Sequence, residues 1–152
     1  MHPKRFALIS LLLGLLCLAC VAAAKDPPID NKPFSSDHVV LQISDAGPEV
    51  QTRVLNVASN LIKYYGPDKV DVEVVAFGAG VNLLLAGNAN AVRIHTLSES
   101  YGVKFDACQN TLDSLERTLG HTPRILPDAR PVASGAARIV ELVQQGYVLL
   151  RP

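Results

Sequence analysis

The stretch VDVEVVAFGAG, residues 70–80, decides the fold. In its first half three valines alternate with acidic residues, and its second half is apolar up to Phe77. Valine-rich runs of this kind are typical of a strand that enters a sheet covered on both faces. The glycines Gly78 and Gly80 then end the run in a turn. The sequence therefore predicts a buried strand whose carboxyl end opens into a tight turn.

Strand-like and helix-like segments alternate on both sides of this stretch. Short runs rich in Val, Ile or Leu predict strands, and longer stretches with apolar residues three or four apart predict helices. This alternation favours an α/β sandwich with a mostly parallel sheet and right-handed crossovers. The predicted strands are residues 39–43, 70–77, 103–107, 130–133 and 147–150, and the predicted helices are residues 48–65, 81–86, 89–101, 110–119 and 135–145. The inner face predicted for the last helix is Ala136, Ile139, Val140 and Val143.

The first residues of the chain have the features of an export signal. Lys4 and Arg5 precede a long apolar run that ends in the small residues Ala22-Ala23-Ala24. A basic start, an apolar centre and a small-residue exit predict a signal peptide over residues 1–24, and hence a periplasmic or secreted protein without a membrane span after cleavage. An uncleaved anchor helix is one alternative, and a lipoprotein attached through Cys20 is another.

The remaining chain suits one globular domain. Its total length of 152 residues leaves no room for a second full core. Residues 25–37 carry three prolines without an apolar period and are interpreted as a linker, and residues 38–152 as the domain. Basic and acidic residues balance at 14 each, so the chain has no net positive charge to attract the phosphates of nucleic acid. Trp is absent and aromatic residues are few, which argues against base stacking. Cys108 is the one cysteine beyond the predicted signal peptide.

Small and polar residues gather in the turns that follow the predicted strands. In a parallel sheet these turns lie along one edge, where open α/β folds bind ligands. The turns hold Ser44-Asp45, Gly78-Ala79-Gly80, Cys108-Gln109-Asn110 and Ser134-Gly135. We call this edge the Cys108 rim and take it as the candidate site, because it carries the thiol.

Cys108 directly precedes a predicted helix, where free N–H groups and the helix dipole stabilise an anion such as a thiolate. Thr111 and Asn110 in the first turn, and Ser134 across the rim, are candidate supporting residues. Asp106 would oppose a thiolate if strand alternation places it on the same face as the thiol. The alternative interpretation is a small buried side chain at a strand end, since cysteine often fills such positions.

Other motifs on the chain are weaker. Gly78 and Gly80 lack the later Gly-Lys-Ser or Gly-Lys-Thr of a phosphate loop, so a plain turn at the rim is favoured and no cofactor is expected. His38, His95 and His121 show no paired spacing, and no metal site is expected. Ser134 is not part of a Gly-x-Ser-x-Gly motif and is interpreted first as a helix cap.

Taken together, four segments of the domain resemble the DsrE/DsrF-like family of small sulfur-handling proteins. They are residues 72–81 (VEVVAFGAGV), 102–112 (GVKFDACQNTL), 133–135 (ASG) and 145–152 (QGYVLLRP). The resemblance implies a three-layer α/β/α sandwich with a sheet of about five strands and assembly into a homotrimer or homohexamer. It also implies a cysteine that accepts sulfur as a persulfide, and Cys108 matches that position.

Two functional hypotheses follow. In the first, an exported protein carries sulfane sulfur on Cys108 and acts at most as a sulfurtransferase-like carrier, receiving sulfur from a small donor or a partner sulfur-transfer protein. Backbone N–H groups after Cys108 would stabilise the anion, with Ser134 or Asn110 orienting it. In the second, the domain is a non-catalytic module that binds a small ligand or a protein, and Cys108 is structural. Flavodoxin-like nucleotide binding at Gly78 is a third and weaker hypothesis.

Overall fold

The computed structural model describes residues 26–152 and contains a sheet of five parallel strands in the order β4-β3-β2-β1-β5. Helices occupy the connections, as the alternating pattern predicts. The strands are β1 (Asp37–Ile43), β2 (Val70–Ala76), β3 (Lys104–Cys108), β4 (Ala129–Val132) and β5 (Val148–Leu150). The α-helices are α1 (Pro48–Tyr65), α2 (Ala91–Tyr101), α3 (Gln109–Leu119) and α4 (Gly135–Gln144), and η1 (Gly78–Leu84) is a 3₁₀ helix.

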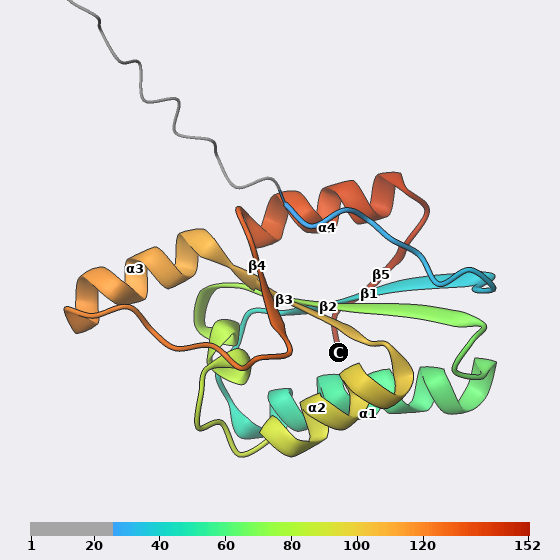
Figure 1. Cartoon of the computed structure of the whole chain (residues 1–152), viewed down its shortest axis with the longest axis horizontal. Helices are drawn as coiled ribbons and strands as arrows, with labels where there is room; N and C mark the ends of the chain where they lie inside the picture. The colour runs from blue at the N-terminus through green and yellow to red at the C-terminus, as the bar shows by residue number, and fades with distance from the viewer. Residues whose placement is uncertain (1–25) are drawn as a thin grey trace, which may run out of the picture.

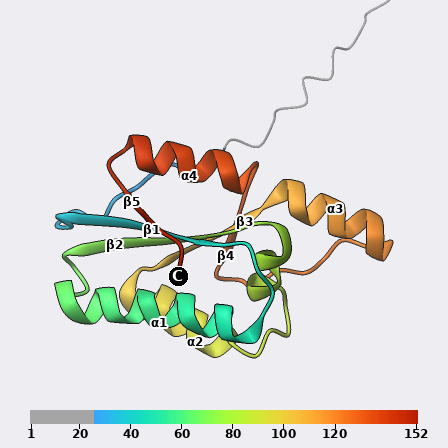
Figure 2. The same ribbon diagram turned by 180° about the vertical axis from the view of Figure 1, so that it is seen from behind.

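Three layers make up the fold. The two views show α1 and α2 together on one face of the sheet and α4 on the other, with α3 extending beyond the carboxyl end of β3 (Figures 1 and 2). This arrangement confirms the predicted α/β/α sandwich and its parallel sheet. The short helix predicted over residues 81–86 is the one element that differs in kind, because the chain turns into a 3₁₀ helix directly at Gly78.

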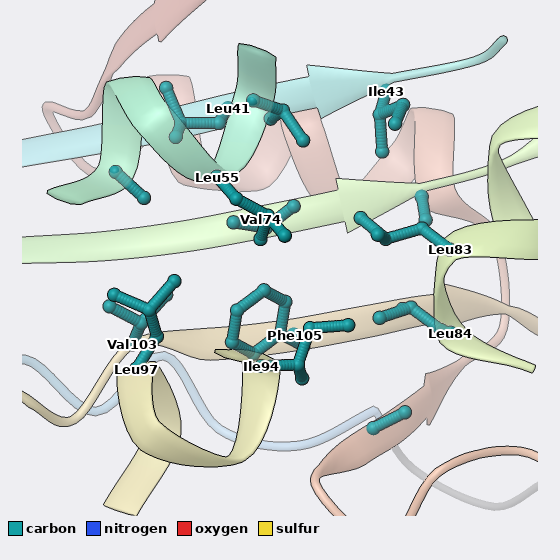
Figure 3. Packing of buried hydrophobic residues seen from close by; sticks show 14 of the residues in the cluster. Leu41, Ile43, Leu55, Val74, Leu83, Leu84, Ile94, Leu97, Val103 and Phe105 are labelled. Carbon is teal, nitrogen blue, oxygen red and sulfur yellow. The ribbon is translucent and has the colours of Figure 1, made fainter. Parts of the chain in front are cut away.

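The face under α1 and α2 holds the larger hydrophobic core. Leu41, Val74 and Phe105 project from three neighbouring strands toward Leu55 of α1 and Ile94 of α2 (Figure 3). All five side chains are fully buried. The odd-even alternation of β2 places its remaining residues, Asp71 and Glu73 among them, on the opposite face.

The face under α4 has a smaller apolar cluster and several charges. Val40 and Val75 of the sheet contact Ile139 and Leu142 of α4. Arg138 lies among them and is only 1% exposed. The predicted inner face of α4 is therefore mostly wrong. Ile139 is buried as predicted, but Ala136, Val140 and Val143 are exposed, and Arg138 and Leu142 are buried instead. Arg138 is buried because acidic residues of β2 and β3 lie beneath it.

Residues 26–36, called here the N-terminal strap, lie along the same side of the sheet as α4 (Figures 1 and 2). The strap has no helix or strand, in line with its prolines. Unlike a flexible linker, it is held against the domain by hydrogen bonds. Asp26 Oδ1 accepts a hydrogen bond from Ala133 N at 2.6 Å, and the Pro27 carbonyl accepts one from Arg138 Nη1 at 2.8 Å.

Farther along the strap, Asn31 Oδ1 lies 2.7 Å from the Tyr147 hydroxyl, and the Asp30 carbonyl accepts a hydrogen bond from Lys104 Nζ. The predicted signal peptide, its cleavage after Ala24 and the alternative lipid attachment at Cys20 lie outside the described residues. Within residues 26–152, each helix is too short or too polar to cross a membrane.

Candidate functional site

Cys108 ends β3 and is the N-cap residue of α3. It is 5% exposed, and within residues 26–152 it has no disulfide partner. The helix begins at Gln109 without a side-chain cap, so its first N–H groups remain close to the thiol. The structure thus places the cysteine at the carboxyl edge of the sheet, at the positive end of a helix.

Gly135, the first residue of α4, lies directly against the cysteine. A Cβ built on Gly135 would be 3.2 Å from the Cys108 Cβ and 3.0 Å from the Phe77 Cβ. These separations are shorter than ordinary carbon–carbon contacts, so a side chain at Gly135 would push α4 away from β3. The Ser134-Gly135 turn of the predicted rim therefore lies next to Cys108, and its glycine provides the close approach.

Thr111 joins the Cys108 turn to the Gly78 turn. Its Oγ1 accepts a hydrogen bond from Gly78 N at 3.0 Å. Gly78 has a φ of +54°, and a Cβ on Gly80 would lie 2.3 Å from the Ile43 carbonyl oxygen at the end of β1. The two glycines are thus required for a turn packed against its neighbouring strand.

The other two supporting candidates have mainly local roles. Ser134 Oγ accepts a hydrogen bond from Ala137 N at 3.4 Å, which caps α4. Asn110 N donates to the Ala133 carbonyl at 3.4 Å and links the α3 turn to the end of β4. Cys108 pairs in register with Val132, so these residues share one corner of the rim.

A buried cluster of two carboxylates and two guanidinium groups lies under α4, beside this corner. Arg130 Nε and Nη2 donate to Asp106 Oδ1 at 2.9 and 2.6 Å. Arg138 Nε donates to Glu73 Oε1 at 2.7 Å and lies 3.3 Å from Asp106 Oδ2. Both carboxylates are fully buried, whereas Arg130 is partly exposed. We call Glu73, Asp106, Arg130 and Arg138 the charge cluster.

Burial, together with the Glu73 carboxyl beside it, raises the pKa of Asp106 from 3.8 to about 8. Burial acts in the same direction on Glu73, but its hydrogen bonds with Asp106 and Arg138 outweigh it and lower the pKa of Glu73. At neutral pH the two carboxyl groups therefore hold one proton between them. With both guanidinium groups charged, the cluster carries one net positive charge.

The position of Asp106 resolves one uncertainty of the sequence interpretation. Asp106 and Cys108 do lie toward the same layer, since Asp106 contacts Arg138 and Cys108 contacts Gly135 of the same helix. Because the carboxyl group is protonated and paired with arginines, it does not place a lone negative charge beside the thiol. Residues two apart on a strand are separated by about 7 Å, close enough for the charge cluster to influence Cys108.

The sequence interpretation did not include Glu73, Arg130 or Arg138. The sequence did contain one indication of the cluster: Glu73 lies inside the valine-rich run of β2, and a buried carboxylate requires a charged or hydrogen-bonding partner. The identity of that partner was not visible, since Arg138 lies 65 residues away along the chain. By contrast, a groove between α1 and α2, lined by Lys63, Arg93 and Tyr101 among others, lies at the opposite edge of the sheet and does not involve Cys108.

The fold and the rim define a class: a small three-layer α/β/α protein with one thiol at a strand-to-helix turn. The chain belongs to the DsrE/DsrF-like family, whose model matches residues 37–152. Family membership relates the protein to sulfur relay in general terms. Among solved structures, the chain resembles a protein of unknown function from Methanobacterium thermoautotrophicum, with 29% identity, a TM-score of 0.67, and coverage of 76% of this chain and 99% of that one. Comparison with curated proteins gives no match.

Proposed function

We propose that the protein carries sulfane sulfur as a persulfide on Cys108. The observation that carries the proposal is the one thiol of residues 26–152, at the N-terminus of α3 and the carboxyl edge of the sheet, in a chain of a family related to sulfur relay. A persulfide is an anion at neutral pH, and the N–H groups of Gln109 and Thr111 in the first turn of α3 are placed to stabilise it.

The loading step is a displacement on sulfur. With thiosulfate as donor, the Cys108 thiolate forms a bond to the terminal sulfur, the sulfur–sulfur bond of thiosulfate breaks, and sulfite leaves with the electron pair. The product is a persulfide anion, and no external oxidant or reductant takes part. Transfer to an acceptor thiolate is the same displacement at the outer sulfur, and it regenerates the Cys108 thiolate.

The charge cluster favours this chemistry. Its net positive charge beside Cys108 attracts an anionic donor. Since Asp106 keeps its proton up to about pH 8, this effect holds at neutral pH. Asn110 and Ser134 are proposed to orient the persulfide, although in the thiol form Ser134 caps α4.

The exposed apolar residues suit self-association into the proposed homotrimer or homohexamer. Val140 and Val143 of α4 and Val148 and Leu149 of β5 are each 43–59% exposed. Large exposed aliphatic groups on neighbouring elements are typical of subunit contacts. We also propose export, which N-terminal sequencing of the protein from the cell envelope would test by finding Lys25 as the first residue.

Intact mass measurement tests the sulfur carrier. The purified protein is incubated with thiosulfate or polysulfide under native conditions, with Cys108→Ser as the matched control. We expect sulfur mass on the wild type that dithiothreitol removes and that Cys108→Ser lacks. The full chain also contains Cys17 and Cys20, which both proteins share, so only the difference in sulfur mass between them reports on Cys108. Equal loading of the two proteins would contradict the proposal.

The second candidate function is a non-catalytic binding module, and the burial of Cys108 against Gly135 favours it. Thiol titration separates the two functions. If Cys108 reacts with a small thiol reagent only after denaturation, the cysteine is structural, whereas reaction in the folded protein supports the carrier.

A further inference from the structure

A second group of chemically active side chains lies away from the Cys108 rim. His95 and Glu99 are four residues apart on α2, so both lie on the same face of that helix. Asp128, in the turn before β4, faces them, and its Oδ1 is 3.2 Å from His95 Nδ1. One ligand atom from each of the three residues lies within 4.8 Å of the other two.

The elements that carry these side chains are held firmly in place. Ile94 and Leu97 anchor α2 in the core with almost no exposure. The turn is fixed at both ends, because Leu126 N donates to the Leu84 carbonyl and Ala129 N to the Leu126 carbonyl. The Asp128 side chain is only 10% exposed, whereas His95 is 64% exposed and reachable from solvent. The backbone positions of the three donors are thus fixed, while the His95 and Glu99 side chains are open to solvent.

We propose that His95, Glu99 and Asp128 bind a divalent transition-metal ion, with Zn²⁺ as the reference ion. One imidazole nitrogen and two carboxylate oxygens are ligands that Zn²⁺ accepts, at about 2.0–2.2 Å each, with water at the remaining position. Tetrahedral ligands at that radius are about 3.4 Å apart, close to the His95–Asp128 separation. Glu99 would supply the third ligand, since one of its carboxylate oxygens lies within 4.8 Å of the other two ligand atoms.

The donor set also predicts selectivity. An imidazole ligand favours Zn²⁺, Ni²⁺ and Cu²⁺ over Mg²⁺ and Ca²⁺, which prefer sites made entirely of oxygen. The order of affinity expected for such a site places Cu²⁺ above Ni²⁺ and Zn²⁺. Mg²⁺ at equal concentration is therefore expected not to displace Zn²⁺.

The metal site is separate from the thiol. Asp128 precedes Ala129, which pairs with Phe105 at the start of the β3–β4 ladder, while Cys108 pairs with Val132 at its end. Three residues along a strand separate the two positions by about 10 Å. Cys108 is therefore not a ligand, and loss of persulfide chemistry would not affect metal binding.

Calorimetric titration of the chelator-treated full chain with Zn²⁺ tests the proposal. His95→Gln and Asp128→Asn remove one ligand each, and His121→Gln changes an exposed histidine outside the group as the matched control. We expect one Zn²⁺ per chain in the wild type and in His121→Gln. We expect His95→Gln and Asp128→Asn to lose at least as much affinity as the loss of an outer-shell partner costs, which is roughly 10–100-fold.

Co²⁺ serves as a second probe, because its absorption bands report the ligand type. Bands of nitrogen and oxygen ligation without a thiolate charge-transfer band, present also in Cys108→Ser, would support the site. Zinc affinity of His95→Gln equal to that of the wild type, or no saturable binding up to millimolar Zn²⁺, would overturn it. Circular dichroism of each variant ensures that a loss of binding is not a loss of folding, and Glu99→Gln provides a variant on the exposed side of the group.

Discussion

The two faces of the sheet are buried by different means. Under α1 and α2, strands and helices meet through aliphatic and aromatic side chains such as Leu55 and Phe105. Under α4 and the strap, Asp71, Glu73 and Arg138 are buried to a similar degree. The first face is held by area removed from water, which many sequences could supply. The second depends on the pairing of particular charges, because a single missing partner leaves an ion without compensation.

This difference has a consequence for function. The charged face borders Cys108 through Asp106 and the start of α4. Cys108 also belongs to the larger hydrophobic core, but that core brings no charged group to the thiol. The polar layer thus supplies charge where chemistry is proposed and makes that side sensitive to pH. The apolar layer supplies most of the stability and is expected to be indifferent to pH.

The largest effect is expected from Arg138→Met. Loss of the guanidinium group leaves Glu73 buried with only Arg130, 3.5 Å away, as a cationic partner. We expect the free energy of unfolding, measured by urea denaturation, to fall by about 3–5 kcal/mol. The double variant Glu73→Met/Arg138→Met should recover most of that loss, since two apolar side chains replace the pair. A loss below about 1 kcal/mol in the single variant would show that this pairing does not stabilise the face.

On the apolar face, Leu55→Ala creates a cavity rather than an unpaired charge. Leu55 is fully buried between α1 and the sheet, and its truncation is expected to lower the free energy of unfolding by about 2–5 kcal/mol. The loss should be the same at pH 6 and pH 8, because no titrating group is involved. A strongly pH-dependent loss would mean that the two faces are coupled.

The pH dependence of stability distinguishes the faces directly. The pKa of Asp106 is raised in the folded protein to about 8, so the contribution of its proton is complete below the unfolded value of 3.8 and is lost as the pH rises through about 8. Glu73 has a lowered pKa and contributes the opposite dependence, but only below its ordinary value of 4.5. Between pH 6 and 8 the free energy of unfolding should therefore fall by about 2–3 kcal/mol.

Asp106→Asn is the control for this dependence. The amide approximates the protonated carboxyl group at every pH, so the slope of the free energy of unfolding between pH 6 and 8 should become smaller. Urea denaturation at several pH values in both proteins provides the comparison. Identical slopes in the two proteins would show that Asp106 does not hold a proton in the folded state.

The smallest effect is expected where the strap meets the charged face. The Tyr147 hydroxyl lies 2.9 Å from Asp71 Oδ2 and 2.7 Å from Asn31. Tyr147→Phe should lower the free energy of unfolding by about 1.5 kcal/mol, since Asp71 keeps its ion pair with Lys104. Tyr64→Phe, at a tyrosine that is 82% exposed, should have almost no effect. Equal losses would show that the strap contact contributes little.

Most of the fold was predictable because periodic patterns encode local structure. The run before Gly78 predicts β2, and Gly66 and Gly102 end their helices where the patterns predict. The turn that places Cys108 at the rim follows from the same rule. What failed was the inner face of α4, where hydrophobicity favours Val140 and Val143 and the structure buries Arg138. Which face of a helix is buried depends on the residues that it packs against, and α4 packs against acidic residues of the sheet.

By itself, the sequence determined the order of strands and helices, the parallel sheet and the place of its one candidate thiol, because these depend on spacing along the chain. Only the tertiary structure decided which charges meet. Glu73 pairs with Arg138, Asp128 with His95, and Asn31 of the strap with Tyr147. The partners are separated by 33 to 116 residues in the sequence. Ion pairs and donor sets of this kind depend on positions in space, and a local pattern does not contain those positions.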